Sequence, residues 1–459
     1  MMQHDLRWFL ELLDARGELV RVKEEVAPHL EVAAICRDLA YQQGPAVLFE
    51  HVQGCGMPVV ANLFSKRQRL ADALGITEAE LREHWLRAFA QPIEPELVSG
   101  GPCQEVVESR VDLTTFIPNI LWHPKDGGPY IPFGLSIVKD PDTGRRNMAI
   151  YRIQIKGPTR LGMKLQPPHH GGVAQAKAAA RGERLEIAIA IGGDPALHIA
   201  SQALVPYGVD EIALAGALRG RPIPLVRCQS VDLEVPAFAE IVLEGVVLTE
   251  LTETEGPFGE FQGYYSGAAP RQVVEIRRIT HRHAPLYLAT YEGRPIGNTH
   301  ILQAAARDPL YFKQIQDTVC PTVRDVCVTY GGNACYHVVV SIRQQAAGQA
   351  KNVALELLKD SRVKHVVVVD HDVDIRNPIE VEWAIATRFQ ADRDLLILPG
   401  MASQHLDPSQ PAHPSGLGCK VAVDATVPFG QRFDVIEFPP EVERLVAERW
   451  ERYGFPRRG

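Results

Sequence analysis

Two glutamates five positions apart, Glu255 and Glu260, enclose two glycines and a proline. This composition favours a turn rather than one face of a helix, and loops on a rigid scaffold often carry catalytic groups. A carboxyl group in a dry pocket near aromatic rings has a raised pKa, so it can donate a proton at neutral pH. The pair therefore predicts a proton donor. The alternative is a polar surface loop with two solvated glutamates.

A strand is predicted over Asn147–Arg152, a mostly apolar segment with an amide at one end and a guanidinium at the other. In a regular strand, residues five apart face opposite sides, so Asn147 and Arg152 would serve two different surroundings. Arginine suits bidentate binding of a carboxylate or a phosphate. An ordinary strand with an arginine at its edge is the alternative interpretation.

Two further polar pairs stand before glycines or at the start of a helix. His169 and His170 precede two glycines, where a histidine can bind a metal or the backbone amides can approach a phosphate. The alternative for this pair is an exposed, inert loop. Asp210 and Glu211 open a predicted helix, where Asp210 can cap the helix and Glu211 is favoured by its dipole. Taken alone, capping explains both acids.

Two segments imitate binding sites. Asp370, Asp372 and Asp374 look like a metal cluster, but they follow a buried strand, where acidic residues commonly end the strand, so we interpret them as structural. The segment Gly416–Lys420 is rich in glycine but matches neither a phosphate loop nor a dinucleotide fingerprint, although Lys420 could reach an anion.

The elements that must position these residues change in character along the chain. Residues 1–105 are expected to form a small α/β domain. Residues 106–310 hold several predicted strands and few helices, which favours a closed or half-closed β-barrel. Residues 311–459 alternate helices with β-branched runs, which is typical of a three-layer α/β domain.

Residues 311–459 contain two segments whose patterns predict individual elements. His337–Ile342 and His365–Asp370 are rich in valine and predict buried strands. Residues 440–453 have helical spacing, and one face forms an expected docking stripe of Leu445, Val446 and Trp450.

Composition excludes several classes of protein. The chain has 459 residues and a net charge of −8, which argues against a general nucleic-acid or membrane-surface binder. It has no run of about 18 apolar residues, and its first residues do not read as a signal peptide. The eight cysteines are dispersed without a C-x-x-C pair, so we expect reduced thiols and a cytoplasmic protein.

Taken together, these segments resemble the UbiD-type decarboxylase family over essentially the whole chain. Each motif alone is weak, but their order and joint presence are specific. The motifs are N-x-x-I-Y-R at Asn147–Arg152, H-x-G-G at His169–Gly172, E-x-x-x-A-G from Glu211, E-G-P-F-G-E at Glu255–Glu260 and S-G-L-G-x-K at Ser415–Lys420.

The resemblance implies a fold and an activity. The fold is a small N-terminal α/β domain, a split β-barrel like that of flavin reductases, and a C-terminal α/β domain that forms homodimers or hexamers. The activity is reversible, non-oxidative decarboxylation of an aromatic, heteroaromatic or α,β-unsaturated carboxylic acid through a covalent adduct to prenylated FMN. A flavin prenyltransferase would supply that cofactor.

The resemblance also implies roles for individual residues. Arg152 would orient the substrate carboxylate and pair with Glu255, and Glu260 would protonate the carbon that loses carbon dioxide. A divalent metal, Mn²⁺ or Mg²⁺, would be held by Asn147, His169 and Glu211 and would act with K⁺ at the cofactor phosphate. The cofactor would contact Ile150, Tyr151, Arg152, His170, Gly171 and Lys420. His170 replaces an arginine that some members carry.

The substrate and the class of protein leave alternatives open. We expect the segment Arg294–Leu302 to face the substrate, with Asn298 or His300 as a polar contact, unless it is a plain connection into the next helix. The competing classes are an FMN-binding electron-transfer protein on the same barrel, a metal-dependent hydrolase that uses the acids at 370–374, and a scaffold without enzymatic activity.

Overall fold

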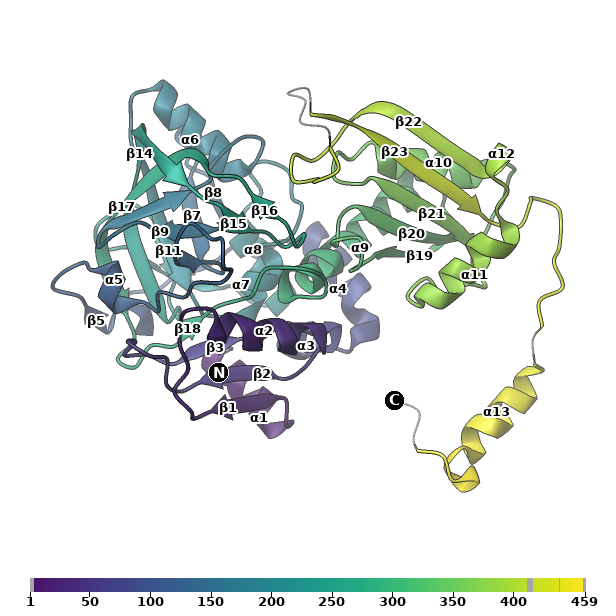
Figure 1. The fold of residues 1–459 in the computed structure, drawn as a ribbon, viewed down its shortest axis with the longest axis horizontal. Coiled ribbons are helices and arrows are strands. Elements are labelled where there is room, and N and C mark those ends of the chain that lie inside the picture. Colours follow the sequence, from purple (N-terminus) through teal and green to yellow (C-terminus); the bar gives the residue numbers. More distant parts are fainter. Residues whose placement is uncertain (1–3, 411–415, 437, 457–459) are drawn as a thin grey trace.

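The computed structural model describes residues 4–410, 416–436 and 438–456, which form an N-terminal, a central and a C-terminal part (Figure 1). Ser415, the first residue of the S-G-L-G-x-K motif, lies outside these ranges. The fold is mixed α/β, as expected. Within the described ranges, no helix combines the length and apolar character needed to cross a membrane.

The N-terminal part is built on a four-stranded sheet in the order β1-β2-β3-β18. Its first helix is capped by Asp5, whose carboxylate accepts a hydrogen bond from Trp8 N at 2.9 Å. The last strand, β18, comes from far along the chain. The elements are α1 (Leu6–Ala15), β1 (Leu19–Val22), α2 (Glu31–Tyr41), β2 (Ala46–Phe49), β3 (Val59–Ala61), α3 (Arg67–Leu74), η1 (Glu78–Glu80), α4 (Leu81–Ala90) and β18 (Tyr287–Leu288).

The central part is a curled, half-closed barrel. Its nine antiparallel strands follow the order β6-β9-β10-β17-β14-β11-β7-β8, with β5 beside β17. The small sheets β13-β12-β4 and β15-β16 complete it. The strands are β4 (Glu96–Leu97), β5 (Val106–Val107), β6 (Tyr130–Ile131), β7 (Leu135–Lys139), β8 (Arg146–Ile150), β9 (Ile153–Ile155), β10 (Arg160–Met163), β11 (Leu185–Ile191), β12 (Pro224–Arg227), β13 (Glu234–Pro236), β14 (Ile241–Glu255), β15 (Phe258–Gly259), β16 (Tyr265–Ser266) and β17 (Ala269–His281).

A bulge lets the two longest strands, β14 and β17, curve together. The register shifts between Glu244 and Gly245, and a Cβ atom at Gly245 would lie 2.2 Å from Glu275 O, so only glycine fits. Short helices cover the barrel, namely η2 (Pro102–Gln104), α5 (Leu113–Phe116), α6 (His170–Ala180), α7 (Pro195–Ala200) and α8 (Glu211–Arg219).

The C-terminal part is a mixed five-stranded sheet in the order β19-β20-β21-β23-β22. Both predicted valine-rich strands are confirmed with the expected bounds. The elements are α9 (Asn298–Thr318), β19 (Val323–Val328), β20 (His337–Ile342), α10 (Gln349–Leu358), β21 (His365–Asp370), α11 (Pro378–Arg388), α12 (Ala391–Asp394), β22 (Leu395–Ala402), β23 (Leu417–Ala425), α13 (Pro440–Arg449) and η3 (Glu451–Tyr453).

Alternation of valines along β20 and β21 produces the three layers. Val338 and Val366 pack in one cluster with Leu357 of α10, whereas Val339 and Val367 pack in another with Val381 of α11. The predicted helix at the tail is present as α13. It has no buried residue and stands clear of the rest of the molecule in Figure 1.

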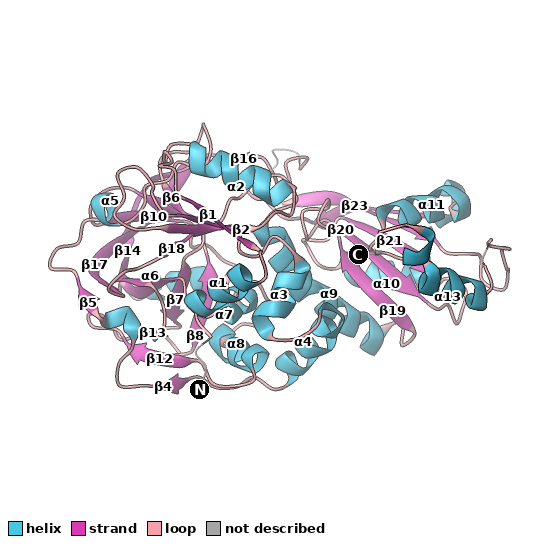
Figure 2. Ribbon diagram, turned by 90° about the horizontal axis from the view of Figure 1, so that it is seen from below, coloured by secondary structure: helices cyan, strands magenta, loops and turns pink. Residues whose placement is uncertain are grey.

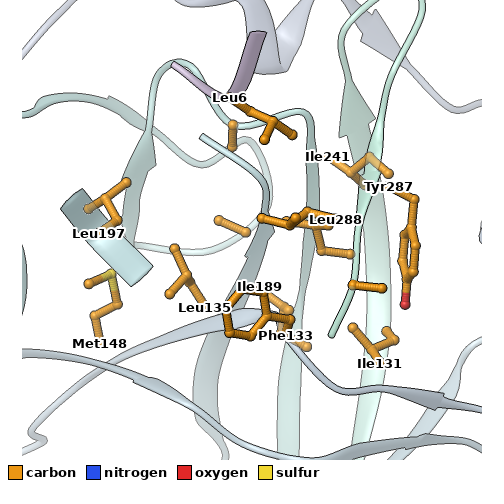
Figure 3. Packing of buried hydrophobic residues seen from close by; sticks show 14 of the residues in the cluster. Leu6, Ile131, Phe133, Leu135, Met148, Ile189, Leu197, Ile241, Tyr287 and Leu288 are labelled. Atoms are coloured by element: carbon orange, nitrogen blue, oxygen red, sulfur yellow. The ribbon is translucent and has the colours of Figure 1, made fainter. Parts of the chain in front are cut away.

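The N-terminal and central parts share one hydrophobic core, which Figure 3 shows with Leu6 above Leu135, Ile189 and Tyr287. The C-terminal part has clusters of its own. Helix α9 lies between the two bodies (Figure 2) and runs without a break across residue 310. The boundaries expected at 105 and 310 therefore stay predictions.

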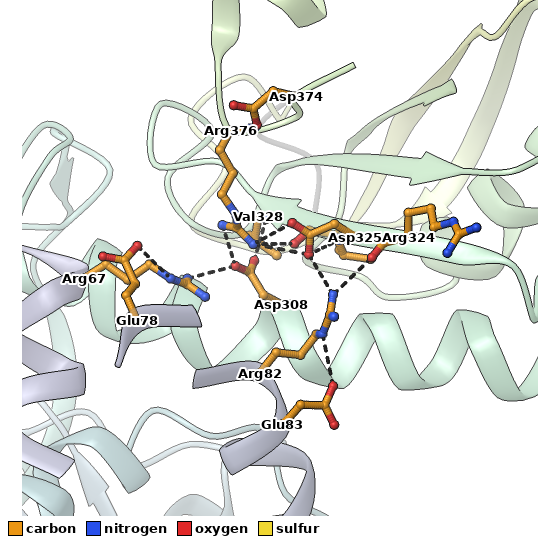
Figure 4. A network of polar contacts seen from close by, with 11 residues as sticks. Arg67, Glu78, Arg82, Glu83, Asp308, Arg324, Asp325, Val328, Asp374 and Arg376 are labelled. Carbon is orange, nitrogen blue, oxygen red and sulfur yellow. Dashed lines mark hydrogen bonds and ion pairs between the residues drawn. The ribbon is translucent and has the colours of Figure 1, made fainter. Parts of the chain in front are cut away.

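A buried carboxylate on α9 joins the N-terminal and C-terminal parts (Figure 4). Asp308 accepts hydrogen bonds from Arg67 Nη1 of α3 at 3.0 Å, from Arg376 Nη1 at 3.1 Å and from Val328 N at 2.8 Å. Arg376 also pairs with Asp325, 3.2 Å away. Because Asp308 is buried and fully paired, this network holds the C-terminal sheet against α3.

Candidate active site

Arg152 holds both predicted catalytic glutamates. Its Nη2 donates to Glu255 Oε2 at 2.7 Å, and its Nη1 donates to Glu260 Oε1 and to Ser266 Oγ. The three residues thus come together as the resemblance implied. Strand β8 ends at Ile150, so the predicted regular strand over 147–152 is wrong, and Arg152 lies in the break before β9.

The two carboxylates have different surroundings. Glu255 is the last residue of β14 and is fully buried, and it also accepts a hydrogen bond from Tyr130 Oη at 2.9 Å. Burial and the Glu255 carboxylate raise the pKa of Tyr130, so its hydroxyl keeps the proton that it donates. Glu260 follows the short strand β15 and is 13% exposed. Glu260 is therefore the more accessible of the two carboxylates that Arg152 binds.

Three of the polar residues singled out in the sequence meet at the start of α8. Asn147 Nδ2 donates to Glu211 Oε1 at 2.9 Å, and Met148 N donates to Glu211 Oε2 at 2.8 Å. Asp210 caps the helix through Ile212 N at 2.8 Å, so the capping interpretation holds for Asp210, whereas Glu211 turns inward to the barrel.

Of the histidine pair, His170 lies beside the Glu211 carboxylate and His169 is its neighbour in the chain. His169 is the residue before α6, and burial lowers its pKa, with Lys164 and Arg362 adding to the effect. His170 Nδ1 lies 3.6 Å from Glu211 Oε1. Tyr151 Oη accepts a hydrogen bond from Gly171 N at 3.2 Å. A Cβ atom at Gly171 would lie 2.6 Å from Tyr151 Oη, which explains the glycine.

This group has the chemistry of a metal site. Asn147 Oδ1 is buried and has no hydrogen-bond partner in the part of the chain that the structure describes. An amide oxygen, a neutral imidazole and a carboxylate suit Mn²⁺ or Mg²⁺ better than a thiophilic metal. The residues present therefore fit a divalent metal, which would take the oxygen that Asn147 leaves free.

Lys420 lies apart from the other predicted residues. It is a buried residue of β23, and its Nζ donates to Leu358 O at 2.7 Å and to Asp360 O at 2.5 Å, at the end of α10. Its contact with a cofactor phosphate stays a prediction. In this arrangement, Lys420 satisfies carbonyls that end a helix.

Other basic side chains, which no sequence motif includes, lie near His169 and His405 instead. Burial lowers the pKa of both rings, with Lys164 and Arg362 adding to the effect at His169, and Lys164 and Arg271 adding to it at His405. Their sequence positions are scattered, so no spacing could have revealed them. Together they make this region attractive to an anion.

Asn298 and His300, in the segment predicted to face the substrate, have different surroundings. Asn298 Oδ1 accepts from Phe64 N at 2.6 Å and its Nδ2 donates to Thr290 Oγ1 at 3.1 Å, so this amide is used within the protein. His300 is buried on α9, and burial lowers the pKa of its ring to about 4, against hydrogen bonds to the Phe261 backbone and the Asn333 side chain that act to raise it. Its ring contacts Phe261, the residue after Glu260, with centroids 5.8 Å apart.

Glu292 is a titratable neighbour of Glu260 that the sequence did not single out. Burial raises the pKa of Glu292 to about 8, and the nearby Glu260 acts in the same direction. Thr299 Oγ1 donates a hydrogen bond to its carboxyl group at 2.6 Å. At neutral pH this carboxyl group is protonated.

The acidic run at 370–374 is structural, as interpreted from the sequence. Arg388 donates to Asp370 at 3.2 Å and to Asp372 at 2.7 Å, and Val427 N donates to Asp370 at 2.6 Å. Across residues 4–410, 416–436 and 438–456, no group of three or more His, Cys, Asp and Glu side chains is arranged to hold a metal.

Family profiles match the chain in three consecutive segments. The N-terminal domain of 3-octaprenyl-4-hydroxybenzoate carboxy-lyase (UbiD) matches residues 10–89, its Rift-related domain matches 96–295 and its C-terminal domain matches 300–425. The Rift-related match contains every predicted catalytic and metal-binding residue.

Solved structures resemble the whole chain. HmfF from Pelotomaculum thermopropionicum, a UbiD-class enzyme in complex with FMN, is 41% identical with a TM-score of 0.90, covering 96% of this chain and 98% of HmfF. An evolved dimeric form of HmfF with prFMN is 39% identical with a TM-score of 0.88, with the same coverage. Vanillic acid decarboxylase from Sedimentibacter hydroxybenzoicus is 33% identical with a TM-score of 0.89, covering 99% of this chain and 100% of the enzyme.

A further relative extends the family likeness. Anhydromevalonate phosphate decarboxylase from Methanothermobacter thermautotrophicus is 38% identical over 420 residues, which are 91% of this chain and 96% of that enzyme. Three profiles in order, full-length structural likeness and the joined Arg152, Glu255 and Glu260 lead to one conclusion: the chain belongs to the UbiD family of carboxy-lyases and is a decarboxylase.

Proposed function

We propose that this enzyme catalyses reversible, non-oxidative decarboxylation of an aromatic, heteroaromatic or α,β-unsaturated carboxylic acid with prenylated FMN. The observation that carries the proposal is the Arg152 guanidinium, which binds both Glu255 and Glu260 close to the end of β8, the strand that carries Asn147. The complexes of HmfF with FMN and with prFMN support the choice of cofactor.

The cofactor would be held mainly by residues of the central part. Asn147, His169 and Glu211 would hold Mn²⁺ or Mg²⁺, and this metal, with K⁺, would bind the cofactor phosphate. Ile150, Tyr151, His170 and Gly171 would line the flavin. The unpaired Oδ1 of Asn147 and the lowered pKa of His169 support these roles, because both leave a lone pair for a cation.

The chemical roles divide among three side chains. Bound prenylated FMN supplies an electron sink for the bond that breaks. Arg152 orients the substrate carboxylate by its fork of N–H donors. Glu255, held by Tyr130 and buried, keeps Arg152 in place. Glu260 then delivers a proton from its carboxyl oxygen to the carbon that has lost carbon dioxide.

His300 would set the substrate preference. Its buried ring lies against Phe261, the residue after Glu260, and near the side chain of Asn333. A hydroxyl group, a ring heteroatom or a second carboxylate on the substrate would be a polar partner for this ring. With a panel of aromatic and heteroaromatic acids, His300→Ala should lose its preference for such polar acids, and an unchanged profile would remove the idea.

The assembly would be a homodimer or a hexamer formed through the C-terminal part, in the cytoplasm, with a flavin prenyltransferase as cofactor supplier. The arm that carries α13 supports self-association, because Phe429, Ile436 and Phe438 are exposed on it. Light scattering of the full chain and of a form ending at Pro428 should show that the shorter form has the lower mass.

The decisive experiment begins with anaerobic co-expression with a flavin prenyltransferase. The released cofactor should have the mass of prenylated FMN, and the holoenzyme should release carbon dioxide from members of the acid panel. Glu260→Gln should keep the cofactor and lose turnover. Plain FMN, with electron transfer that does not depend on Glu255 and Glu260, would instead support the electron-transfer alternative.

A further inference from the structure

We propose that Asp126 and His123 form a positioning pair that fixes the loop carrying Glu260 and thereby sets the rate of proton delivery. The inference rests on the proposed role of Glu260 as proton donor. Both residues lie in the segment between α5 and β6, which none of the sequence motifs includes.

Asp126 anchors the loop directly. Its carboxylate is fully enclosed by protein, and its Oδ1 accepts a hydrogen bond from Gly259 N at 2.8 Å. Gly259 is the residue immediately before Glu260. A buried carboxylate that accepts a backbone N–H makes a strong, charge-assisted hydrogen bond, so the peptide unit next to the acid has one fixed position.

His123 completes the anchor. Its backbone N donates to Asp126 Oδ2 at 3.0 Å, and its ring Nδ1 lies 3.2 Å from the same oxygen. Its other ring nitrogen, Nε2, lies 2.8 Å from Glu292 O. One imidazole therefore ties the Glu260 loop, through Asp126, to the segment that carries Glu292.

Close packing holds the two loops in register. A Cβ atom at Gly259 would lie 2.4 Å from His123 Nδ1, so the glycine backbone rests against the ring. Gly127 N donates to Pro257 O at 2.8 Å, and a Cβ atom at Gly127 would lie 2.3 Å from Gly256 O. The segment 123–127 therefore runs against 256–259 along its length.

The consequence concerns Glu260 rather than Glu255. The Glu255 side chain is held by both Arg152 and Tyr130, whereas the Glu260 side chain is held by Arg152 and follows β15, whose backbone Asp126 anchors at Gly259. Loss of that hydrogen bond lets the acid sample positions away from the reacting carbon. A misplacement of about 1 Å costs on the order of 100-fold in rate. Binding of the substrate carboxylate by Arg152 should not change.

The test compares Asp126→Ala and Asp126→Asn in the holoenzyme. We expect Asp126→Ala to lower kcat about 10- to 100-fold with KM within about twofold and cofactor content unchanged. Asp126→Asn keeps one acceptor for Gly259 N and should retain an intermediate kcat. Asp112→Ala is the matched control, because Asp112 also accepts a backbone N–H, from Thr114 at 3.1 Å, but lies in the exposed turn at the start of α5.

A second readout does not need turnover. Amide hydrogen exchange of the unloaded protein should show faster exchange at Gly259 in Asp126→Ala and no change in Asp112→Ala. His123→Gln should also speed exchange at Gly259, but by less. This variant serves as the test if Asp126→Ala does not fold. Full kcat with unchanged exchange at Gly259 would overturn the proposal, and so would equal losses of kcat, cofactor and thermal stability.

Failure of the proposed function would look different. In that case, the wild-type enzyme with prenylated FMN would release no carbon dioxide, or Glu260→Gln would keep full turnover. If the wild type is active and Glu260→Gln is inactive, but Asp126→Ala keeps its full kcat, only the positioning role of Asp126 is refuted.

Discussion

Lys164 Nζ lies 2.7 Å from His405 Nε2, and the two residues belong to the central and the C-terminal parts of the chain. Burial lowers the pKa of His405 to about 4, and Lys164 adds to the effect, so the imidazole is neutral and accepts the hydrogen bond. Burial, followed by the charge of Arg152, lowers the pKa of Lys164 to about 8. At pH values between about 4 and about 8, a hydrogen bond from the Lys164 ammonium group to the neutral His405 ring joins the central and C-terminal parts beside the expected phosphate site.

The affinity for FMN should therefore fall above pH 8. Deprotonation of Lys164 removes one positive charge from the group that includes Arg271 and Arg362, and we expect a loss of about tenfold, which is about 1.4 kcal/mol. Fluorescence titration with FMN in Mn²⁺ buffer between pH 6.5 and 9.5 measures it. Lys164→Met should bind weakly at every pH and lack the step near pH 8. A step that persists in this variant would assign it to another group.

Steady-state turnover should separate the roles of Glu260 and Arg152. Glu260→Gln removes the transferable proton and should lower kcat at least about 100-fold with little change in KM. Arg152→Lys loses the fork that binds two carboxylates and should raise KM as well as lower kcat. Steady-state assays with one substrate measure both. If Glu260→Gln affected only KM, the role of this residue as acid would be wrong.

Metal retention should depend on Glu211 and not on its neighbour Asp210. Glu211→Gln removes the charge that a divalent cation needs and should lower Mn²⁺ content and flavin content together. Asp210→Asn keeps an acceptor for the helix cap and loses the charge that pairs with Arg146 Nη1, 2.8 Å away, so it should keep both contents and alter stability by about 1 kcal/mol. Elemental analysis and the flavin absorbance after dialysis against a chelator give the two contents. Equal losses in both variants would point to unfolding of α8.

Glu292 should make the protein less stable as pH rises. Its pKa is about 8 in the folded chain and has its usual value of 4.5 when unfolded, so the unfolded chain releases the proton first. The free energy of unfolding then falls between pH 4.5 and 8, by at most about 1.4 kcal/mol per unit, and not further above 8. The urea midpoint of Glu292→Gln should rise relative to wild type across this window. Glu11→Gln, on the exposed side of α1, should run parallel to wild type.

The sequence could predict elements that depend only on residues close together in the chain. The runs of valine predicted β20 and β21 to the residue, and Asp210 and Glu211 marked the start of α8. It could not predict that Tyr130 meets Glu255, because a contact across 125 positions depends on how the barrel curls. The regular strand expected up to Arg152 failed because the chain breaks there to bring the guanidinium inward.

The same limit applies to the site. Asn147 and Glu211 were joined only through a family resemblance, since spacing alone left capping as the better explanation of Glu211. The glycine-rich motif around Lys420 suggested that this residue binds an anion. In the structure, its ammonium group donates hydrogen bonds to the backbone carbonyls of Leu358 and Asp360 instead. Asp126 and His123 gave no signal, because backbone groups are their main partners and every residue has those.

The double pairing of Arg152 has a consequence for the order of events. Its Nη1 donates to Glu260 and its Nη2 donates to Glu255, so the guanidinium already has two carboxylate partners. If Arg152 binds the substrate carboxylate, one of these partners must give up its hydrogen bond, and Glu260, which Tyr130 does not hold, is the one that can move. Substrate binding would thereby release the proposed proton donor from its ion pair.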